Sequence, residues 1–229
     1  MAVWVEGLAA ARDLVLGETC AGCGAGGGVG LLCPRCREVM DPSPFPVRPA
    51  LPPRGFPPTT AACEYTGPVR RLVLAHKERG RLAAAAPLGR LLAAAVAAAC
   101  PGDDPVVLVP VPSRRSVTRR RGHDPVARMA VAAARLMTGV RPARVRPVLG
   151  HARAVADQGG LDRRQRRVNL RGAFRLRGHL EPGPAHVVVV DDVCSTGATL
   201  AAAAEALRWG AVAGAVVAAP ALRLGTEDT

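Results

Sequence analysis

Two adjacent acids and a loop rich in hydroxyl groups are the residues of this chain best placed to do chemistry. Asp191 and Asp192 follow four valines at 187–190, and the loop 194–199 leads into an Ala-rich helix expected over 200–208. Valines without alternation predict a parallel strand buried on both faces, and ligands bind at the carboxyl ends of such strands. Small loop residues and a helix amino terminus favour an anion. The series predicts a sugar-phosphate site, with carboxylates on the hydroxyls and the loop on the phosphate.

The residues of this segment are also compatible with a structural role. A strand, two acids and a glycine turn also occur as strand, cap and loop without any ligand. A Walker A loop would need a Gly-Lys-Ser/Thr ending, and a dinucleotide loop would need Gly-x-Gly-x-x-Gly. The segment 187–199 contains neither pattern.

Four cysteines near the start of the chain have the spacing of a metal site. Cys20 pairs with Cys23 and Cys33 with Cys36, each across two residues. Two such pairs converge on one tetrahedral ion, for which zinc is the usual occupant. The alternative is two disulfides in a secreted domain. Residues 1–18 place acids inside an apolar run and predict a short amphipathic helix rather than a signal peptide, so we expect structural Zn²⁺ on the four cysteines.

The acids and their loop resemble a known signature. Residues 187–199, Val-Val-Val-Val-Asp-Asp-Val-Cys-Ser-Thr-Gly-Ala-Thr, are similar to the phosphoribosyl pyrophosphate (PRPP) motif of type I phosphoribosyltransferases. In that family the two acids contact the ribose hydroxyls and the loop holds the 5′-phosphate. The resemblance implies catalytic roles for Asp191 and Asp192. It implies a 5′-phosphate site on Cys194, Ser195, Thr196, Gly197, Ala198 and Thr199.

Longer stretches resemble the ComF family of phosphoribosyltransferase-like competence proteins with a double zinc ribbon. The matching segments are 65–81, 106–122, 165–174 and the PRPP loop, together with the cysteine pairs. The resemblance implies a type I phosphoribosyltransferase-like parallel sheet flanked by helices, PRPP with Mg²⁺ as ligand, and a role in DNA uptake beside a DNA-translocating ATPase. One segment departs from the family: members read Arg-Gly-Phe-Asn-Gln where this chain has Arg-Gly-His-Asp-Pro at 121–125.

Basic residues supply a second set of candidates. Ser113, Arg114 and Arg115 follow the apolar run 106–109, which in a parallel sheet places them on the same rim as the acids. The resemblance implies that they bind the pyrophosphate of PRPP together with Lys77, and arginine suits bidentate contact with such oxygens. The alternative is a solvated basic loop.

Two further features of the sequence are compatible with more than one role. His76, beside the candidate lysine, is expected to be structural or solvent-facing rather than catalytic. Segment 154–171 combines glycines with five arginines. It suits either a mobile hood over an anionic site or a helix whose basic face touches nucleic acid.

The order of the expected strands, helices and connecting segments predicts an α/β fold with a small N-terminal module. We divide it into 1–40, an N-terminal helix and the zinc module; 41–58, a Pro-rich connector that cannot enter a sheet centre; and 59–229, the phosphoribosyltransferase-like domain. Strands are expected at 61–65, 106–109 and 187–190, and helices from about 66 to 76, 81 to 100 and 124 to 139. Strands that alternate with helices imply a parallel sheet.

The charge of the chain is compatible with two classes of function. The formal net charge is +13, concentrated in 114–121 and 163–177, and such surfaces attract polyanions. Aromatic side chains that could stack on bases are scarce there, so contacts with DNA would be to phosphates. One hypothesis is an enzyme that transfers the phosphoribosyl group of PRPP with Mg²⁺. The other is a non-catalytic module that keeps the fold and binds single-stranded DNA and a DNA-translocating ATPase.

Compartment is inferred from two features. The Ala-rich run 82–100 is interrupted by Pro87 and Arg90, so no membrane insertion is expected. Cys63, Cys100 and Cys194 have no paired spacing, which indicates reduced thiols in a cytoplasmic protein.

Overall fold

The computed structural model describes residues 19–26, 30–113, 118, 122–152, 172–180, 183, 185–207 and 212–220. The helix expected over 1–18, the candidates Arg114 and Arg115, and the segment 154–171 lie outside the described residues.

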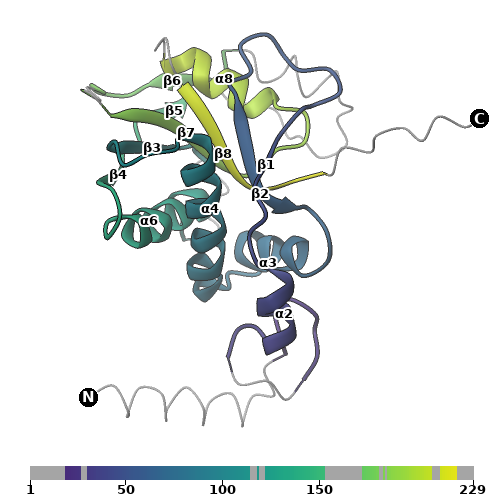
Figure 1. Ribbon diagram of the computed structural model, residues 1–229. Coiled ribbons are helices and arrows are strands. Elements are labelled where there is room, and N and C mark those ends of the chain that lie inside the picture. Colours follow the sequence, from purple (N-terminus) through teal and green to yellow (C-terminus); the bar gives the residue numbers. More distant parts are fainter. Residues whose placement is uncertain are drawn as a thin grey trace, which may run out of the picture.

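A six-stranded, mostly parallel sheet forms the centre of the molecule, which confirms the expected α/β class (Figure 1). Five neighbouring strands pair in parallel, and β1 adds an antiparallel edge. In spatial order the strands are β1 (Phe45–Pro46), β2 (Thr59–Glu64), β8 (Val212–Ala219), β7 (His186–Val193), β3 (Val106–Pro110) and β4 (Ala143–Val145).

The two central strands owe their position to continuous apolar sequence. All five residues of β3 are buried, and so are residues 187–192 of β7. Strands buried on both faces need apolar side chains in both directions, which is why neither alternates. The runs predicted at 106–109 and 187–190 are confirmed. However, β7 continues to Val193, so both acids belong to the strand and do not follow it.

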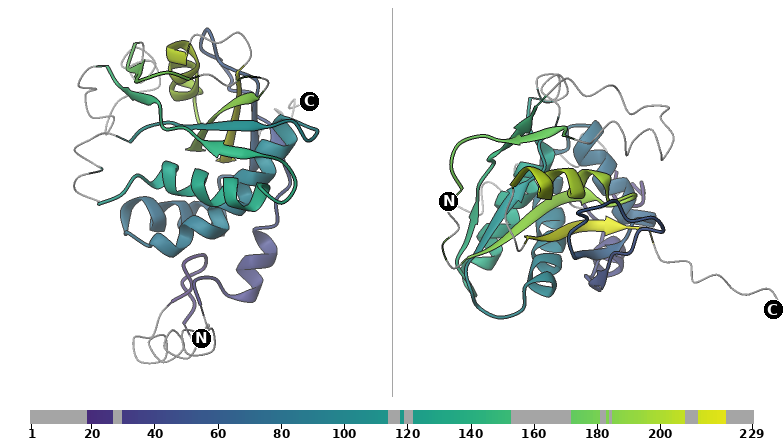
Figure 2. Two further views of the ribbon diagram at one scale, coloured as in Figure 1. Left: turned by 90° about the vertical axis from the view of Figure 1, so that its left-hand side faces the viewer. Right: turned by 90° about the horizontal axis from the view of Figure 1, so that it is seen from above.

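Helices cover both faces of the sheet (Figure 2). One face is packed by α4 (Ala85–Ala99) and α6 (Pro125–Met137), and the other by α8 (Ala198–Leu207) with the hairpin of β5 (Leu149–His151) and β6 (Phe174–Leu176). Helix α3 (Gly67–Glu78) and the 3₁₀ turn η1 (Leu82–Ala84) precede α4. The predicted start of α6 is confirmed, because Asp124 accepts hydrogen bonds from the Val126 and Ala127 amides at 3.0 and 3.1 Å.

The segment Leu82–Ala99 is long and apolar enough to cross a membrane by length and composition, with a mean hydropathy of 1.7. Its packing accounts for this composition. Leu88, Leu91 and Leu92 are fully buried in the core that α4 shares with the sheet and α6. A helix pressed between a sheet and a second helix needs apolar side chains around most of its circumference.

The cysteine segment and the Pro-rich segment both join the main core. Cys36 on α2 (Pro34–Val39) and Met40 after it are buried in the same cluster as Leu72 of α3 and Leu88 of α4 (Figure 1). Within 41–58, β1 pairs with β2 at the sheet edge, where a proline is tolerated. That strand was not predicted.

Candidate functional site

The chain reverses its direction across the sheet between β3 and β7. From β3 it passes through α6 to β4 on one side, and from β7 it passes through α8 to β8 on the other. These helices lie on opposite faces of the sheet, so the chain leaves β3 and β7 in opposite directions at their carboxyl ends. Ligands of open α/β sheets bind at such switch points. Ser113 after β3 and the candidate residues at the end of β7 therefore share one rim.

An acid pair lies buried at this rim. Asp191 and Asp192 are 8% and 4% exposed. Lys77, from the last turn of α3, donates to Asp192 Oδ2 at 2.6 Å. The Asp192 amide donates to Asp191 Oδ1 and the Val193 amide to Asp192 Oδ1, both at 2.8 Å. The predicted pyrophosphate ligand Lys77 thus neutralises one of the two acids.

The environment of Asp191 disfavours its charged form. Burial, and then the neighbouring Asp192 carboxylate, raise the pKa of Asp191 well above its usual value, while Lys77 acts in the opposite direction. Buried acids with perturbed pKa values are typical of binding and catalytic sites.

The loop after β7 is short and enters α8 directly. Gly197 adopts φ of +75°, which favours glycine, and its carbonyl accepts the Ala201 amide at 2.9 Å as α8 begins. The Thr196 hydroxyl accepts from the Ala198 amide at 3.4 Å. Among the described residues, the amides of Ser195 and Thr196 donate to no other group. Two free N–H groups beside a helix amino terminus form an arrangement that suits an oxyanion.

Cys194 is a structural member of this loop. Its side chain is 3% exposed, and burial followed by Asp191 raises the pKa of its thiol to about 12. A neutral, buried thiol is a poor nucleophile, so Cys194 contributes its backbone to the loop and not its sulfur chemistry.

Residues of the Pro-rich segment cover the loop. A side chain at Gly197 would meet Phe56 at 2.6 Å and Pro49 at 3.3 Å. This contact was missed from the sequence. The available signal was weak: Phe56 is one of only three phenylalanines in a chain that is 3% aromatic.

The loop after β3 is tied to the start of α6 by Asp124, one of the three residues at 123–125 that differ from the motif compared above. The Ser113 amide donates to Asp124 Oδ2 at 3.0 Å, while Oδ1 of the same carboxylate caps α6. The Val111 amide donates to the Val190 carbonyl at 3.0 Å, which fixes this loop against β7. Asp124 therefore positions the second loop of the rim.

Two buried histidines support the helices behind the rim. His76 is 1% exposed, and its ring nitrogens lie 3.2 Å from the carbonyls of Arg81 and Pro125. The ring packs on His123 with centroids 5.6 Å apart. Burial lowers the pKa of His76. Of the two roles expected for His76, the structural one agrees with this position, and it joins the end of α3 to the start of α6.

The rim therefore collects the candidates Asp191, Asp192 and Lys77, the loop 194–199, and Ser113. The four cysteines lie apart from it, in the module that carries α2 (Figure 1).

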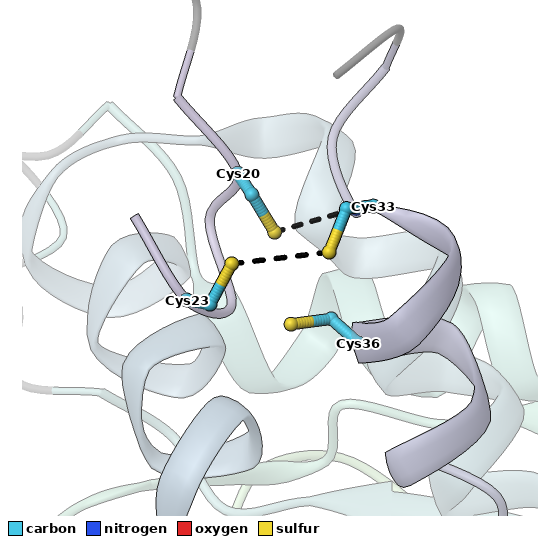
Figure 3. Close-up of side chains that lie close together, drawn as sticks. All are labelled: Cys20, Cys23, Cys33 and Cys36. Carbon is cyan, nitrogen blue, oxygen red and sulfur yellow. Dashed lines mark hydrogen bonds between the residues drawn. The ribbon is translucent and has the colours of Figure 1, made fainter. Parts of the chain in front are cut away.

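The four cysteine sulfurs point toward one another (Figure 3). All lie within 4.8 Å of one another, and the sulfurs of Cys23 and Cys33 are 3.8 Å apart. Four thiolates about 2.3 Å from a tetrahedral zinc ion would be separated by roughly 3.8 Å. Cys20 accepts from the amides of Gly22 and Cys33, and Cys23 accepts from Ala25, at 3.3 to 3.4 Å. The cluster can thus bind a structural zinc ion.

The thiols differ in their ease of ionisation. Burial alone would raise the pKa of Cys20, but the amides of Cys33, Cys23 and Gly22 donate to its sulfur and lower the pKa to about 6. Burial and the three neighbouring thiols raise the pKa of Cys36 to about 12. A cation among the four sulfurs would oppose the raised pKa of Cys36 and favour its thiolate, the form that binds zinc.

A glycine beside the cluster offers a first test of this geometry. A Cβ at Gly22 would lie 2.8 Å from Cys36 Sγ and 3.2 Å from Leu32, whereas Gly26 has open space around it. Gly22→Ala should therefore displace Cys36 and cost about 1 to 3 kcal/mol, the scale of overpacking. Thermal unfolding and zinc content should change in Gly22→Ala but not in the matched Gly26→Ala. Equal behaviour of the two variants would contradict the packing of the cluster.

Fold and site together define an α/β protein with a buried acid pair at the switch point of a mostly parallel sheet and a four-cysteine cluster suited to structural zinc. Over 182 residues, 77% of each chain, it is 33% identical to the DNA utilization protein YhgH of Salmonella typhi. Its identity to YhgH of Salmonella typhimurium is also 33%, with the same coverage. The chain belongs to the family of these proteins. No family model matches it.

Proposed function

We propose that this protein binds PRPP with Mg²⁺ at the rim between β3 and β7 and transfers its phosphoribosyl group, in the manner of ComF-like type I phosphoribosyltransferases. The observation that carries the proposal is the buried pair Asp191 and Asp192, followed directly by a hydroxyl-rich loop at the start of α8. The segment thus combines a loop that can bind a phosphate with two acids that can bind the ribose hydroxyls. The resemblance of 187–199 to the PRPP motif supports it.

Each part of the ligand has a matching group in this arrangement. The amides of Ser195 and Thr196, with the hydroxyls of the loop, face the 5′-phosphate. The carboxylates of Asp191 and Asp192 accept hydrogen bonds from the ribose hydroxyls and hold the sugar in one orientation. Ser113 and its arginine neighbours Arg114 and Arg115 face the pyrophosphate. Magnesium, when bound, supplies positive charge that stabilises pyrophosphate as it leaves.

Lys77 has two partners in this scheme. In the absence of ligand its ammonium group neutralises Asp192 at 2.6 Å, and its side chain is 38% exposed. The arrival of ribose hydroxyls at Asp192 would release the lysine toward the pyrophosphate. The ligand thus replaces one ion pair by another, and the buried acid is never left without a partner.

Calorimetric titration with PRPP and Mg²⁺ tests the proposal. Binding is expected with PRPP and, more weakly, with ribose 5-phosphate, because the latter lacks the pyrophosphate contacts. A screen for pyrophosphate release with nucleobases, amines and nucleic acids then separates transfer from binding. If neither sugar phosphate gives a heat of binding, or if ribose 5-phosphate does not compete with PRPP, the proposed site is refuted.

A second candidate function, DNA binding, is favoured by the family. YhgH is named a DNA utilization protein, and the net charge of this chain is +13. We propose that its arginine clusters bind single-stranded DNA through phosphates, in a cytoplasmic protein that assists DNA uptake beside a DNA-translocating ATPase. This function does not require transfer, so it also stands as the non-catalytic alternative.

Such binding should be salt-sensitive and nearly indifferent to sequence, because phosphate contacts carry no base information. Replacing arginines 119–121 together by Ala should flatten the dependence of log K on log salt by about 2 to 3. The control variant replaces three exposed arginines that lie away from the rim, Arg35, Arg135 and Arg144. It removes the same charge and should change the salt dependence of log K less. Salt-independent affinity for DNA, or equal effects of the two triple variants, would exclude arginines 119–121 from DNA binding.

A further inference from the structure

A groove separate from the sheet rim lies between the cysteine module, the start of α4 and the outer face of α6. Its volume is about 1140 Å³. The walls are mostly apolar and include Leu31 from the module, Pro87 from α4 and Leu136 from α6. A groove of this size exceeds the ~1,000 Å³ upper range of small-ligand sites and suits one face of a helix.

Small side chains form the part of the groove that α4 and α6 supply. Ala86 and Pro87 line it from α4, and Ala132 lines it from α6. The two helices approach closely because α4 has a glycine at position 89, where a Cβ would lie 2.5 Å from the Ala132 side chain. Side chains this small cannot fill the space above them, although protein interfaces are close-packed. The groove therefore has room for bulky apolar side chains of another molecule.

Exposed apolar side chains gather around the groove. Leu136 lines it and is 56% exposed. Val39 of α2 and Leu82 of η1 are also exposed, and each is next in sequence to a residue that lines the groove. These three residues come from segments that are far apart in the chain. Exposed apolar surface with charged residues around it is typical of a site for a protein partner.

The charged side chains of the groove favour an acidic partner. Arg90 donates to Asp41 Oδ1 at 3.2 Å, so these two charges neutralise each other. Arg37 and Arg135 are exposed and share the groove with one further acid, Glu38. Within the described part of the chain, no acid forms an ion pair with either arginine. The remaining charge of the walls is therefore positive, like the +13 of the whole chain, and complements carboxylates.

We propose that this groove binds an acidic amphipathic helix of a partner protein. Bulky apolar side chains of that helix would pack over Ala86, Pro87 and Ala132, and its carboxylates would pair with Arg37 and Arg135. The apolar contacts supply most of the affinity, and the charges select the partner. A helix bound here contacts both the cysteine module and the sheet domain. The inference is independent of any ligand at the rim.

Fluorescence anisotropy of labelled helical peptides, titrated with the full chain, tests the inference. The first peptide is about five turns long, with leucines on one face and glutamates beside and opposite them, and is cross-linked to remain helical. The second has lysines in place of the glutamates. The third has the composition of the first in an order without helical periodicity. The parent chain should bind the glutamate helix about tenfold more tightly than either of the others.

Two pairs of variants locate this binding. Leu136→Glu should weaken binding of the glutamate helix about tenfold, because it places a charge against the apolar face of the helix. Val131→Glu adds the same charge to α6 outside the groove and should have little effect. Arg135→Glu should shift the preference toward the lysine helix. Arg144→Glu makes the same change at an exposed position on β4 and should leave the preference as it is.

Four results would overturn the inference. Equal affinity for the three peptides would reduce the binding to general attraction by a basic chain. Equal effects within either pair of variants would place the binding outside the groove. Absence of binding to the parent would exclude a docked helix of this kind. A parent mass that rises with concentration in sedimentation, and falls in Leu136→Glu, would assign the groove to a second copy instead. Circular dichroism and zinc content, measured for every variant, confine the comparison to folded protein.

Discussion

Replacing Cys36 by Ser should release zinc and melt the cysteine module. Structural zinc in small modules contributes about 10 to 16 kcal/mol of apparent binding energy at neutral pH, and this energy is folding energy. Cys36 and Met40 belong to the same core as α3 and α4, so loss of the module should also lower the melting temperature of the sheet domain. The sheet itself has further core and should persist. Metal analysis should give one zinc per chain in the parent and none in the variant.

Cys63→Ser is the matched control for this experiment. The Cys63 thiol lies on β2, outside the cluster, and donates to the Val217 carbonyl at 3.4 Å, a bond that a hydroxyl can replace. This variant should keep its zinc. Full zinc occupancy in Cys36→Ser, or a disulfide between any two of the four cysteines in the parent, would refute the metal assignment.

Replacing Asp191 and Asp192 together by Asn should weaken PRPP binding by about 1 to 3 kcal/mol, roughly 5- to 150-fold, because hydrogen bonds to charged acceptors are lost. The fold should survive, since the side-chain oxygens of Asn can still accept from the amides of Asp192 and Val193. Calorimetric titration with PRPP and Mg²⁺ measures the loss. Unchanged affinity in the double variant would exclude the acid pair from the site.

The single variant Asp191→Asn should separate binding from stability. Burial and Asp192 raise the folded pKa of Asp191, so the unfolded chain ionises this group at lower pH than the folded protein does. Parent stability should therefore fall as pH rises from the ordinary carboxyl value to the raised one. Asn lacks this cost and should raise the free energy of unfolding at neutral pH by about 0.5 to 2 kcal/mol. A destabilised variant with unchanged affinity would assign Asp191 a structural role instead.

The central elements were predictable because their environment leaves little choice of sequence. Strands buried on both faces must be apolar throughout, so 106–109 and 187–190 located β3 and β7. Asp124 before Pro125 located α6, since a cap and a proline suit the first turn of a helix and little else. The cysteine spacing likewise located the cluster, because two short pairs are sufficient to surround an ion.

The contacts that complete the site depend on tertiary structure and left no local signal. Lys77 and Asp192 are 115 residues apart, and their ion pair depends on the strand order that brings α3 near β7. The cover of Gly197 by Phe56 depends on the path of a proline-rich segment whose edge strand has only two residues. Asp124 was predicted as a helix cap. Its second carboxylate oxygen accepts a hydrogen bond from the Ser113 amide, and the sequence spacing does not predict this contact.

Amide chemical shifts of ¹⁵N-labelled protein, recorded during titration with PRPP and Mg²⁺, test the central claim most directly. The account predicts that the largest changes fall on Ser195, Thr196 and the first turn of α8, with a second group at Ser113, because these amides face the phosphates. The cysteine module, which lies apart from the rim, should stay unchanged. Unmoved loop amides, or changes confined to residues outside the β3 and β7 loops, would contradict a sugar-phosphate site at the acid pair.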